Sequence, residues 1–246
     1  MPISWFGFEY ETKSELEKIS ASNKEIVLLT QTFASPSTKS LIEEFRSNYK
    51  NVKHITYDSF SESSALNAYE SRYGVRGLSN YDFSKSKVIV SIGADFLGDW
   101  QGGGFDCSYA KGRIPDKGTM SRHIQFESNM TLSGANADVR VPLKLNEQKL
   151  VLIEIYKSIV GNKIQLKSDI SLNEKTKKIV DALIREIKSA ADGSVIISGI
   201  KDEDYQSLVL EINEKLNSYS FKPSNTILTR SSDDENISEL ISRMNL

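Results

Sequence analysis

The chain contains a short apolar run that ends in a glycine turn, Lys87-Val-Ile-Val-Ser-Ile-Gly-Ala-Asp-Phe-Leu97. A second run, Arg122-His-Ile-Gln-Phe-Glu127, ends in a single carboxylate. Such short runs, rich in β-branched residues and bounded by turns, are typical of strands in a parallel α/β sheet. Open α/β sheets bind their ligands beyond the carboxyl ends of the strands. We therefore expect the turn at 93–95 and Glu127 to lie where such a sheet would hold a ligand.

Composition and charge describe an ordinary globular protein. The chain has 246 residues, of which 39% are hydrophobic, so it can bury a sizeable core. The formal net charge is −2, and no broad basic field indicates a nucleic-acid partner. No apolar run approaches the roughly 18 residues that a membrane-spanning helix needs. We predict a protein without nucleic-acid partners and without a direct membrane span.

Sulfur chemistry is limited by the cysteine count. Cys107 is the only cysteine, which excludes an internal disulfide, and a cysteine-rich zinc site or an iron–sulfur cluster held by this chain. A nucleophilic pair of Cys107 with His123 lacks a third group at a recognisable spacing. His54 and His123 lie within apparent strands and are read as sheet residues. We therefore predict no catalytic residue and no metal ligand.

Strand-like and helix-like segments alternate along the chain. This order predicts an α/β fold with mostly parallel, Rossmann-like sheets and helices on both faces, which can divide into two subdomains. We expect a first domain over 1–161 and a second α/β passage over 172–246, joined by a polar linker and truncated at its C-terminus. Strands are expected at 25–30, 53–57, before Gly93, and at 122–126, 139–143, 194–198 and 226–229. Helices are expected after Ser35, over 65–73 and 147–160, and around 179–187, 205–216 and 237–244.

Three local features have two interpretations each. Ser35 and Pro36 favour a capped helix over a phosphate cradle, because the glycine-rich nucleotide fingerprints are missing. The glycines at 102–104 permit close approach of a ligand or make the loop mobile, and the mobile loop is favoured. Glu127 suits ribose hydroxyls or the amino edge of guanine, or it is a solvated acid in a turn.

Residues 79–97 and 122–142 resemble the dinucleotide half-site of the molybdopterin oxidoreductases, the dimethyl sulfoxide reductase superfamily. The resemblance implies that Gly93, Ala94 and Asp95 form the first cofactor turn and that Glu127 takes the acidic position. The family's Pro-Gly-Thr-Asp turn is replaced here by Leu145-Asn-Glu-Gln148, which keeps a hydrogen-bonding end and loses the charge. These five positions are therefore expected to form a vestigial cofactor site.

The narrower resemblance is to the molybdopterin-like region of the iron–sulfur subunit of alternative complex III, a bacterial quinol-oxidising complex. It implies a non-catalytic scaffold that packs against other subunits of a membrane-bound respiratory electron-transfer complex, on the periplasmic side of the cytoplasmic membrane. No export signal is visible in the chain. The family uses molybdopterin guanine dinucleotide and iron–sulfur clusters, and we expect neither in this chain. Two alternatives stay open: a fragment of an active molybdopterin oxidoreductase, and a free nucleotide-binding protein.

Overall fold

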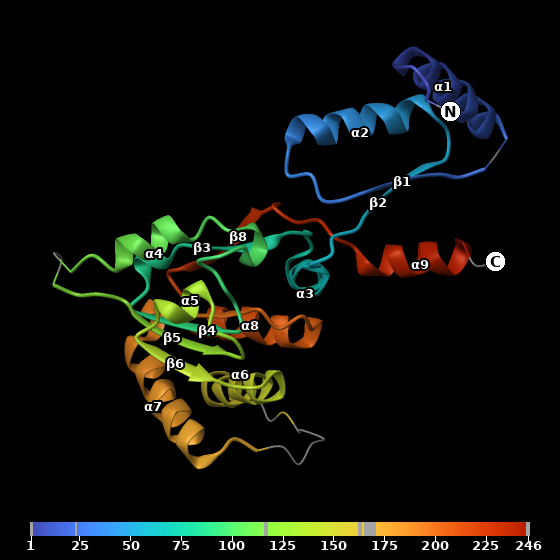
Figure 1. Cartoon of the computed structure of the whole chain (residues 1–246). Coiled ribbons are helices and arrows are strands. Elements are labelled where there is room, and N and C mark those ends of the chain that lie inside the picture. Colours follow the sequence, from blue (N-terminus) through green and yellow to red (C-terminus); the bar gives the residue numbers. More distant parts are fainter. Residues whose placement is uncertain (1, 23, 116–117, 162–163, 165–170, 245–246) are drawn as a thin grey trace. The chain divides into compact units, whose positions relative to one another are not determined.

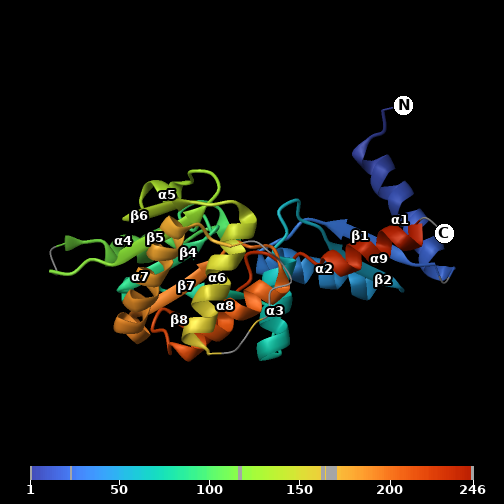
Figure 2. The same ribbon diagram turned by 90° about the horizontal axis from the view of Figure 1, so that it is seen from below.

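The computed structural model describes residues 2–22, 24–115, 118–161, 164 and 171–244 (Figures 1 and 2). The chain divides into two compact units. Unit 1 combines Met1–Ser63 with Thr229–Leu246, and unit 2 is Ser64–Leu228. This division differs from the expected one at residues 161–172, because the strand at Ser194–Ser198 joins the same sheet as the earlier strands. Most of the expected linker, residues 162–163 and 165–170, lies outside the described residues.

Unit 2 is built on a four-stranded parallel sheet with the order β6-β5-β4-β7. The chain moves outward from β4 to β5 and β6, and then returns to place β7 on the other side of β4. This reversal makes a topological switch point between β4 and β7. The strands are β4 (Val88–Ile92), β5 (Arg122–Glu127), β6 (Val139–Pro142) and β7 (Ser194–Ser198). The predicted mostly parallel α/β architecture is confirmed.

One face of this sheet is covered by α6 and α7, with part of α8 (Figure 1). These helices form because apolar side chains recur along one side of each and pack against the strands. Val90 and Ile196 of the sheet are buried in the same cluster as Val151, Leu183 and Ile212 of the helices. The helices are α6 (Leu145–Ile159), α7 (Glu174–Ala190) and α8 (Glu203–Lys215).

The opposite face is covered largely by aromatic side chains. Tyr81, Phe83, Phe96 and Trp100 are buried there against Ile89 of β4. An antiparallel ribbon, β3 with β8, contributes to this layer and joins residues near the two ends of unit 2. The elements on this side and at the carboxyl edge are α3 (Ser63–Tyr73), β3 (Leu78–Tyr81), α4 (Asp106–Gly112), α5 (Leu132–Ala135) and β8 (Phe221–Ile227). Helices therefore cover both faces, as predicted.

Unit 1 holds a two-stranded parallel sheet, β1 with β2. The expected cap is confirmed, because the Ser35 hydroxyl accepts from the Thr38 amide at 3.3 Å and Pro36 is the first residue of α2. The last helix is capped by Asp233, whose Oδ1 accepts from the Asn236 amide at 3.1 Å. The elements are α1 (Trp5–Ala21), β1 (Ile26–Thr30), α2 (Pro36–Asn48), β2 (Val52–Thr56) and α9 (Asp234–Met244). Among the described residues, no helix is both long and apolar enough to cross a bilayer.

The glycine-rich loop at 102–104 links two buried rings of the aromatic layer, and its mobility stays a prediction. Trp100 and Phe105 are both buried, and their ring centroids lie 5.4 Å apart. The three glycines between them take φ values of 88°, 77° and 91°, a backbone conformation that only glycine adopts easily. They let the chain turn tightly enough to bury both flanking rings.

Candidate functional site

The turn after β4 lies at the carboxyl edge of the sheet, as expected. Gly93 has a φ of 71°, and its amide donates to the Phe126 carbonyl of β5 at 2.7 Å. The carbonyl of Ala94, which is fully buried, accepts from the Ser91 hydroxyl at 2.8 Å and from Gln125 Nε2 at 3.1 Å. The turn is thus held by hydrogen bonds from its own strand and from the neighbouring strand.

Asp95 joins this turn to the short helix α5. Its Oδ1 accepts from the Ser133 amide at 2.9 Å and from the Ser133 hydroxyl at 2.8 Å. The same hydroxyl accepts from the Leu97 amide at 2.9 Å. Asp95 and Ser133 therefore fix the loop after β4 to the loop after β5, and the acid serves a structural contact.

Glu127, the last residue of β5, is 2% exposed, so its interpretation as a solvated acid is wrong. Oε1 accepts from Arg140 Nε at 2.5 Å and from the Thr131 amide at 3.3 Å. Oε2 accepts from the Thr131 hydroxyl at 2.6 Å and from Gln125 Nε2 at 3.3 Å. A carboxylate accepts about four hydrogen bonds. The carboxylate is therefore saturated by donors of the protein, and a ligand hydroxyl would have to displace one of them.

Gln148 projects from α6 into the same region and is buried. Its Nε2 donates to the Ser128 hydroxyl at 2.9 Å and to the Leu143 carbonyl at 3.0 Å. Its Oε1 lies 2.6 Å from the position that a Cβ on Gly93 would occupy. The amide thus ties the loops after β5 and β6 together and covers the glycine turn after β4.

Gly199 closes the crevice at the switch point between β4 and β7. Its amide donates to the Ile92 carbonyl at 2.9 Å. A Cβ built on Gly199 would lie 2.1 Å from the carbonyl oxygen of Gly93, so only glycine fits there. The backbone of Gly199 therefore packs directly on the backbone of Gly93, at the edge where an open α/β sheet would hold a ligand. Sequence reasoning missed Gly199, although it follows a strand-like run just as Gly93 does.

A buried row of polar side chains lies on one face of β5, at alternate positions 123, 125 and 127. The ring of His123 contacts the Tyr109 hydroxyl through Nδ1 at 3.2 Å and Gln125 Oε1 through Nε2 at 3.1 Å. The amide oxygen can only accept, which assigns the ring proton to Nε2. Burial lowers the pKa of His123 to about 4, so the ring is neutral at pH 7. His123 is a sheet residue, as predicted. Its Nε2 donates to Gln125, while its Nδ1 lies beside the Tyr109 hydroxyl, which donates to the Asn136 carbonyl at 3.1 Å.

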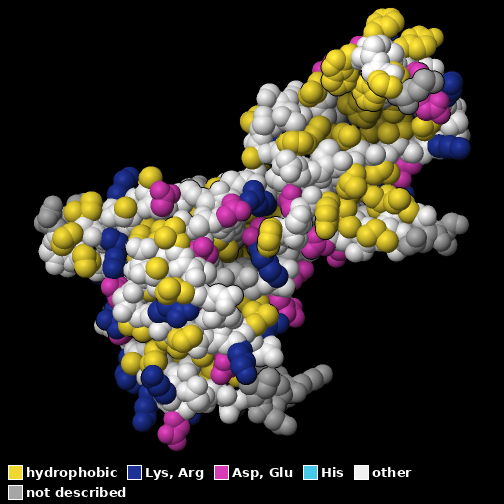
Figure 3. All heavy atoms as spheres, in the orientation of Figure 1, with side chains coloured by type: hydrophobic (Ala, Val, Ile, Leu, Met, Phe, Trp, Pro, Cys, Tyr) yellow, Lys and Arg dark blue, Asp and Glu magenta, His cyan; other side chains and the backbone are white. Residues whose placement is uncertain are grey.

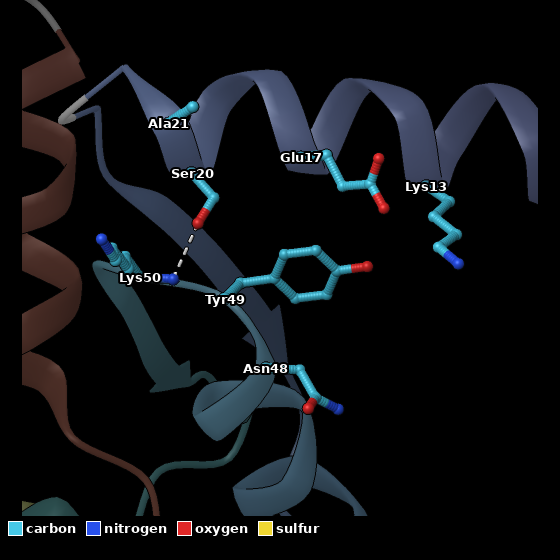
Figure 4. A pocket seen from close by; sticks show the side chains of 7 residues that line it. All are labelled: Lys13, Glu17, Ser20, Ala21, Asn48, Tyr49 and Lys50. Carbon is cyan, nitrogen blue, oxygen red and sulfur yellow. Dashed lines mark hydrogen bonds between the residues drawn. The ribbon is translucent and has the colours of Figure 1, made fainter.

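Two hollows on the surface differ in position from the expected cofactor site. In unit 1, a hollow of about 520 Å³ lies between the end of α1 and the end of α2. Figure 4 shows the Tyr49 ring extending below α1 beside Glu17, and the Ser20 hydroxyl accepts from the Lys50 amide at 2.8 Å. In unit 2, a shallow hollow of about 720 Å³ is lined by α4 and α5, including the exposed Cys107. Neither hollow is lined by any of the five expected site residues.

The residues that the structure describes contain no group of three or more His, Cys, Asp or Glu side chains placed to hold a metal ion. Asp95, the acid of the turn after β4, binds Ser133. Chemically, the carboxyl edge is a set of mutually satisfied polar groups. It stabilises the turns between strands. The carboxylate oxygens of Glu127 and the side-chain N–H groups of Gln148 are bonded within the protein, and Gln148 Oε1 faces the Gly93 turn.

No family model matches the sequence, and no curated protein matches it. Solved structures do match in three dimensions. One is a chain of the formyltransferase/hydrolase complex from Methylorubrum extorquens in complex with methylofuran, with a TM-score of 0.54, 14% identity and coverage of 83% of this chain. Another is acetylene hydratase from Pelobacter acetylenicus, with a TM-score of 0.54, 15% identity and coverage of 89%.

The fold is Rossmann-like α/β. At these identities the likeness concerns the fold alone. The matched region spans 54% of the chain from the formyltransferase/hydrolase complex and 33% of acetylene hydratase. The fold is thus shared with parts of larger enzymes.

Proposed function

We propose that this chain is a non-catalytic domain with the fold of the molybdopterin oxidoreductases, and that it acts as a scaffold within a multi-subunit complex. The observation that carries the proposal is the filled carboxyl edge. Gln148 covers the glycine turn, Gly199 closes the switch point, and Glu127 has its oxygens saturated. The cradle geometry of an α/β ligand site is present, and side chains and backbone of the chain itself occupy it.

Two observations support the choice of family. Residues 79–97 and 122–142 resemble the dinucleotide half-site of molybdopterin oxidoreductases. The fold is also similar to that of acetylene hydratase, at 15% identity. The residues present do not fit the cofactor, however. A dinucleotide at the first turn would have to displace Gln148 from Gly93, and Cys107, the only cysteine, is exposed on α4.

The more specific form of the proposal assigns the domain to the iron–sulfur subunit of alternative complex III or a close equivalent. There it would pack against partner subunits on the periplasmic side of the cytoplasmic membrane. The resemblance of the sequence supports this assignment, and the similarity to a chain of a multi-subunit complex is in keeping with partner subunits. The domain's contribution to electron transfer would be positional.

The test is a cofactor analysis of the purified protein combined with calorimetric titration of GDP. We expect no molybdenum, no pterin fluorescence after oxidation, and no heat of GDP binding. A Gln148→Gly variant uncovers Gly93 and asks whether the glutamine is what fills the site. Stoichiometric molybdenum with pterin would contradict the proposal in favour of an active oxidoreductase fragment. GDP binding by the unaltered chain would favour a free nucleotide-binding protein.

A further inference from the structure

Strand β1 of unit 1 has the apolar sequence that is typical of a buried strand, but its residues are not buried. Its residues are Ile26-Val-Leu-Leu-Thr30, and none is buried, with Leu29 54% exposed. The strands β4 and β7 of the same chain have comparable compositions and are buried at every position. Continuous apolar runs are typical of parallel strands that are covered on both faces. Part of the cover expected for β1 is therefore absent from the described residues.

One backbone edge of β1 faces away from β2, the strand with which it pairs. The Ile26 amide donates to the Asn51 carbonyl at 3.0 Å, and at the other end the Tyr57 amide donates to the Thr30 carbonyl at 2.8 Å. In a parallel ladder the residues that face a given neighbour alternate, so the odd positions point the other way. The N–H and C=O groups of Val27 and Leu29 therefore form the outer edge.

No other strand pairs with this edge among the described residues, since the sheet has the order β1-β2 only. The outer edge of β2, by contrast, is met at one point by the start of α9, where the Asp233 amide lies 3.4 Å from the Thr56 carbonyl. Soluble proteins protect exposed edges with lysine, proline or bulges. Ile26–Thr30 contains none of these protections. Its sequence therefore suits pairing.

Uncovered apolar side chains are concentrated in the same unit. Eleven of the nineteen large hydrophobic side chains that are exposed among the described residues belong to unit 1, which holds about a third of the chain. Figure 3 shows hydrophobic side chains gathered over this part of the surface. Of these eleven side chains, Leu29 alone lies on the two strands. A two-stranded sheet is marginal in water by itself, and a third strand with covering side chains is the usual remedy.

We propose that an extended apolar segment of a partner polypeptide adds to the outer edge of β1 as a third strand. This inference rests on the proposed scaffold role and names the contact through which the domain holds its partner. The main chain of Val27 and Leu29 supplies two N–H donors and two C=O acceptors, and the partner's alternating side chains cover the exposed faces. A second copy of the chain fits less well as the partner. If two β1 strands paired, the faces of both sheets would remain uncovered.

The test compares two variants of one residue in the full chain, purified through an affinity tag together with its bound polypeptides. Leu29→Pro removes an outward N–H while the ladder to β2 is kept, since proline is tolerated at sheet edges. Leu29→Ala removes more of the apolar side chain and keeps the N–H. Amide hydrogen exchange at Val27 and Leu28 is measured in each sample, since Leu28 faces β2 and reports whether the fold persists.

We expect the Val27 amide to exchange at least tenfold more slowly in the assembled sample than in the isolated chain. We also expect Leu29→Pro to lose the bound polypeptide and the protection at Val27, with Leu28 still protected, whereas Leu29→Ala retains both. The proposed strand contact is contradicted if a polypeptide binds and the Val27 amide stays unprotected. It is also contradicted if Leu29→Pro retains the bound polypeptide as well as Leu29→Ala does. Either result leaves the scaffold role standing. Protection that rises with the concentration of the isolated chain assigns the edge to a second copy and overturns the partner strand. A chain recovered alone, with Val27 unprotected, overturns the contact as well.

Discussion

The side-chain oxygen of Gln148 covers Gly93 so closely that it lies 2.6 Å from where a Cβ on that glycine would be. The glycine belongs to the turn after β4, and the glutamine belongs to α6, which follows β6. Two elements far apart in sequence therefore meet where the sheet would otherwise offer a ligand cradle. The contact links the stability of the fold to the closure of the site.

A double-mutant cycle at these two residues measures that link. Gly93→Ala should destabilise the protein by about 2–4 kcal/mol, because the new Cβ meets Gln148 and because alanine is strained at positive φ. Adding Gln148→Ala removes the clash and should give a favourable coupling of about 1–2 kcal/mol, while the strain of the turn persists. Urea unfolding of the four proteins gives the coupling. Strict additivity would show that the glutamine does not press on the turn.

Gly199→Ala provides a contrasting case at the switch point. Its Cβ would lie 2.1 Å from the carbonyl oxygen of Gly93, which is backbone and cannot rotate away. We expect a loss of more than about 3 kcal/mol, as for severe overpacking. Gln148→Ala should not relieve this loss. Thermal unfolding of the single and double variants checks both statements, and rescue by Gln148→Ala would contradict the backbone contact.

Substitution of Glu127 tests the buried ion pair. Glu127→Gln keeps the shape but cannot accept from all four donors, so Arg140 and Thr131 lose partners. We expect a loss of about 2–4 kcal/mol, moderated because Arg140 reaches solvent. The control is Glu70→Gln at the surface pair with Arg76, which should cost about 1 kcal/mol or less. Equal effects at the two sites would mean that Glu127 is solvated in solution.

The stability of the protein should depend on pH through His123. Burial lowers the pKa of this ring to about 4 from 6.5, so between these values the unfolded chain binds a proton that the folded chain does not. The stability is therefore lost as the pH falls from about 6.5 to about 4, by about 3 kcal/mol in total, and no further loss from this group follows below pH 4. Urea unfolding across this range measures the slope.

His123→Gln should flatten that slope, at the cost of lower stability at pH 7. His54 is the control, because burial, with a smaller effect from Arg46, also lowers its pKa and adds a dependence of the same sign. The slope of stability against pH that remains in the His54→Gln variant is due to the other titrating groups, including His123. If His123→Gln leaves the slope unchanged, the ring titrates normally in the folded state and is not buried in solution.

Unit 2 should fold when expressed alone as residues 64–228. It contains the complete four-stranded sheet and both layers that cover it. Its two ends lie near one another because Leu78 pairs with Ile227 in the β3–β8 ribbon. We expect cooperative urea unfolding and a helical far-ultraviolet circular dichroism spectrum. A non-cooperative transition would show that the sheet depends on unit 1.

The strands of the central sheet were predictable because their apolar runs are continuous and end in clear turns. The run at 194–198 coincides with β7. Elements without such a signal were missed, notably α1, none of whose residues is buried, and α4, which lies within a glycine-rich segment. The strand β8 begins at Phe221, whereas we expected it to begin at Thr226. Its first half was missed because Lys222, Pro223 and nearby polar residues are not typical of a buried strand.

The candidate site was predictable in position but not in state. The turns at 93–95 and at Glu127 lie at one edge of the sheet, as parallel topology requires. The burial and pairing of Glu127 depend on the register between β5 and β6, because this register places Arg140 beside Gln125. The register between two strands cannot be read from the pattern of a single sequence. The role of these residues in cofactor binding stays a prediction.

The division of unit 1 between the two ends of the chain sets an order of events during synthesis. The helix α9 packs against β2, and Ser231 and Ser232 bind Thr32 and Glu62, so residues made last complete a structure begun first. The strands β1 and β2 therefore leave the ribosome long before the helix that they need, and wait while unit 2 is translated. A nascent polypeptide stalled before residue 229 would contain all residues of unit 2 but would lack the last segment of unit 1, so the apolar strand β1 would be made well before its unit could be completed.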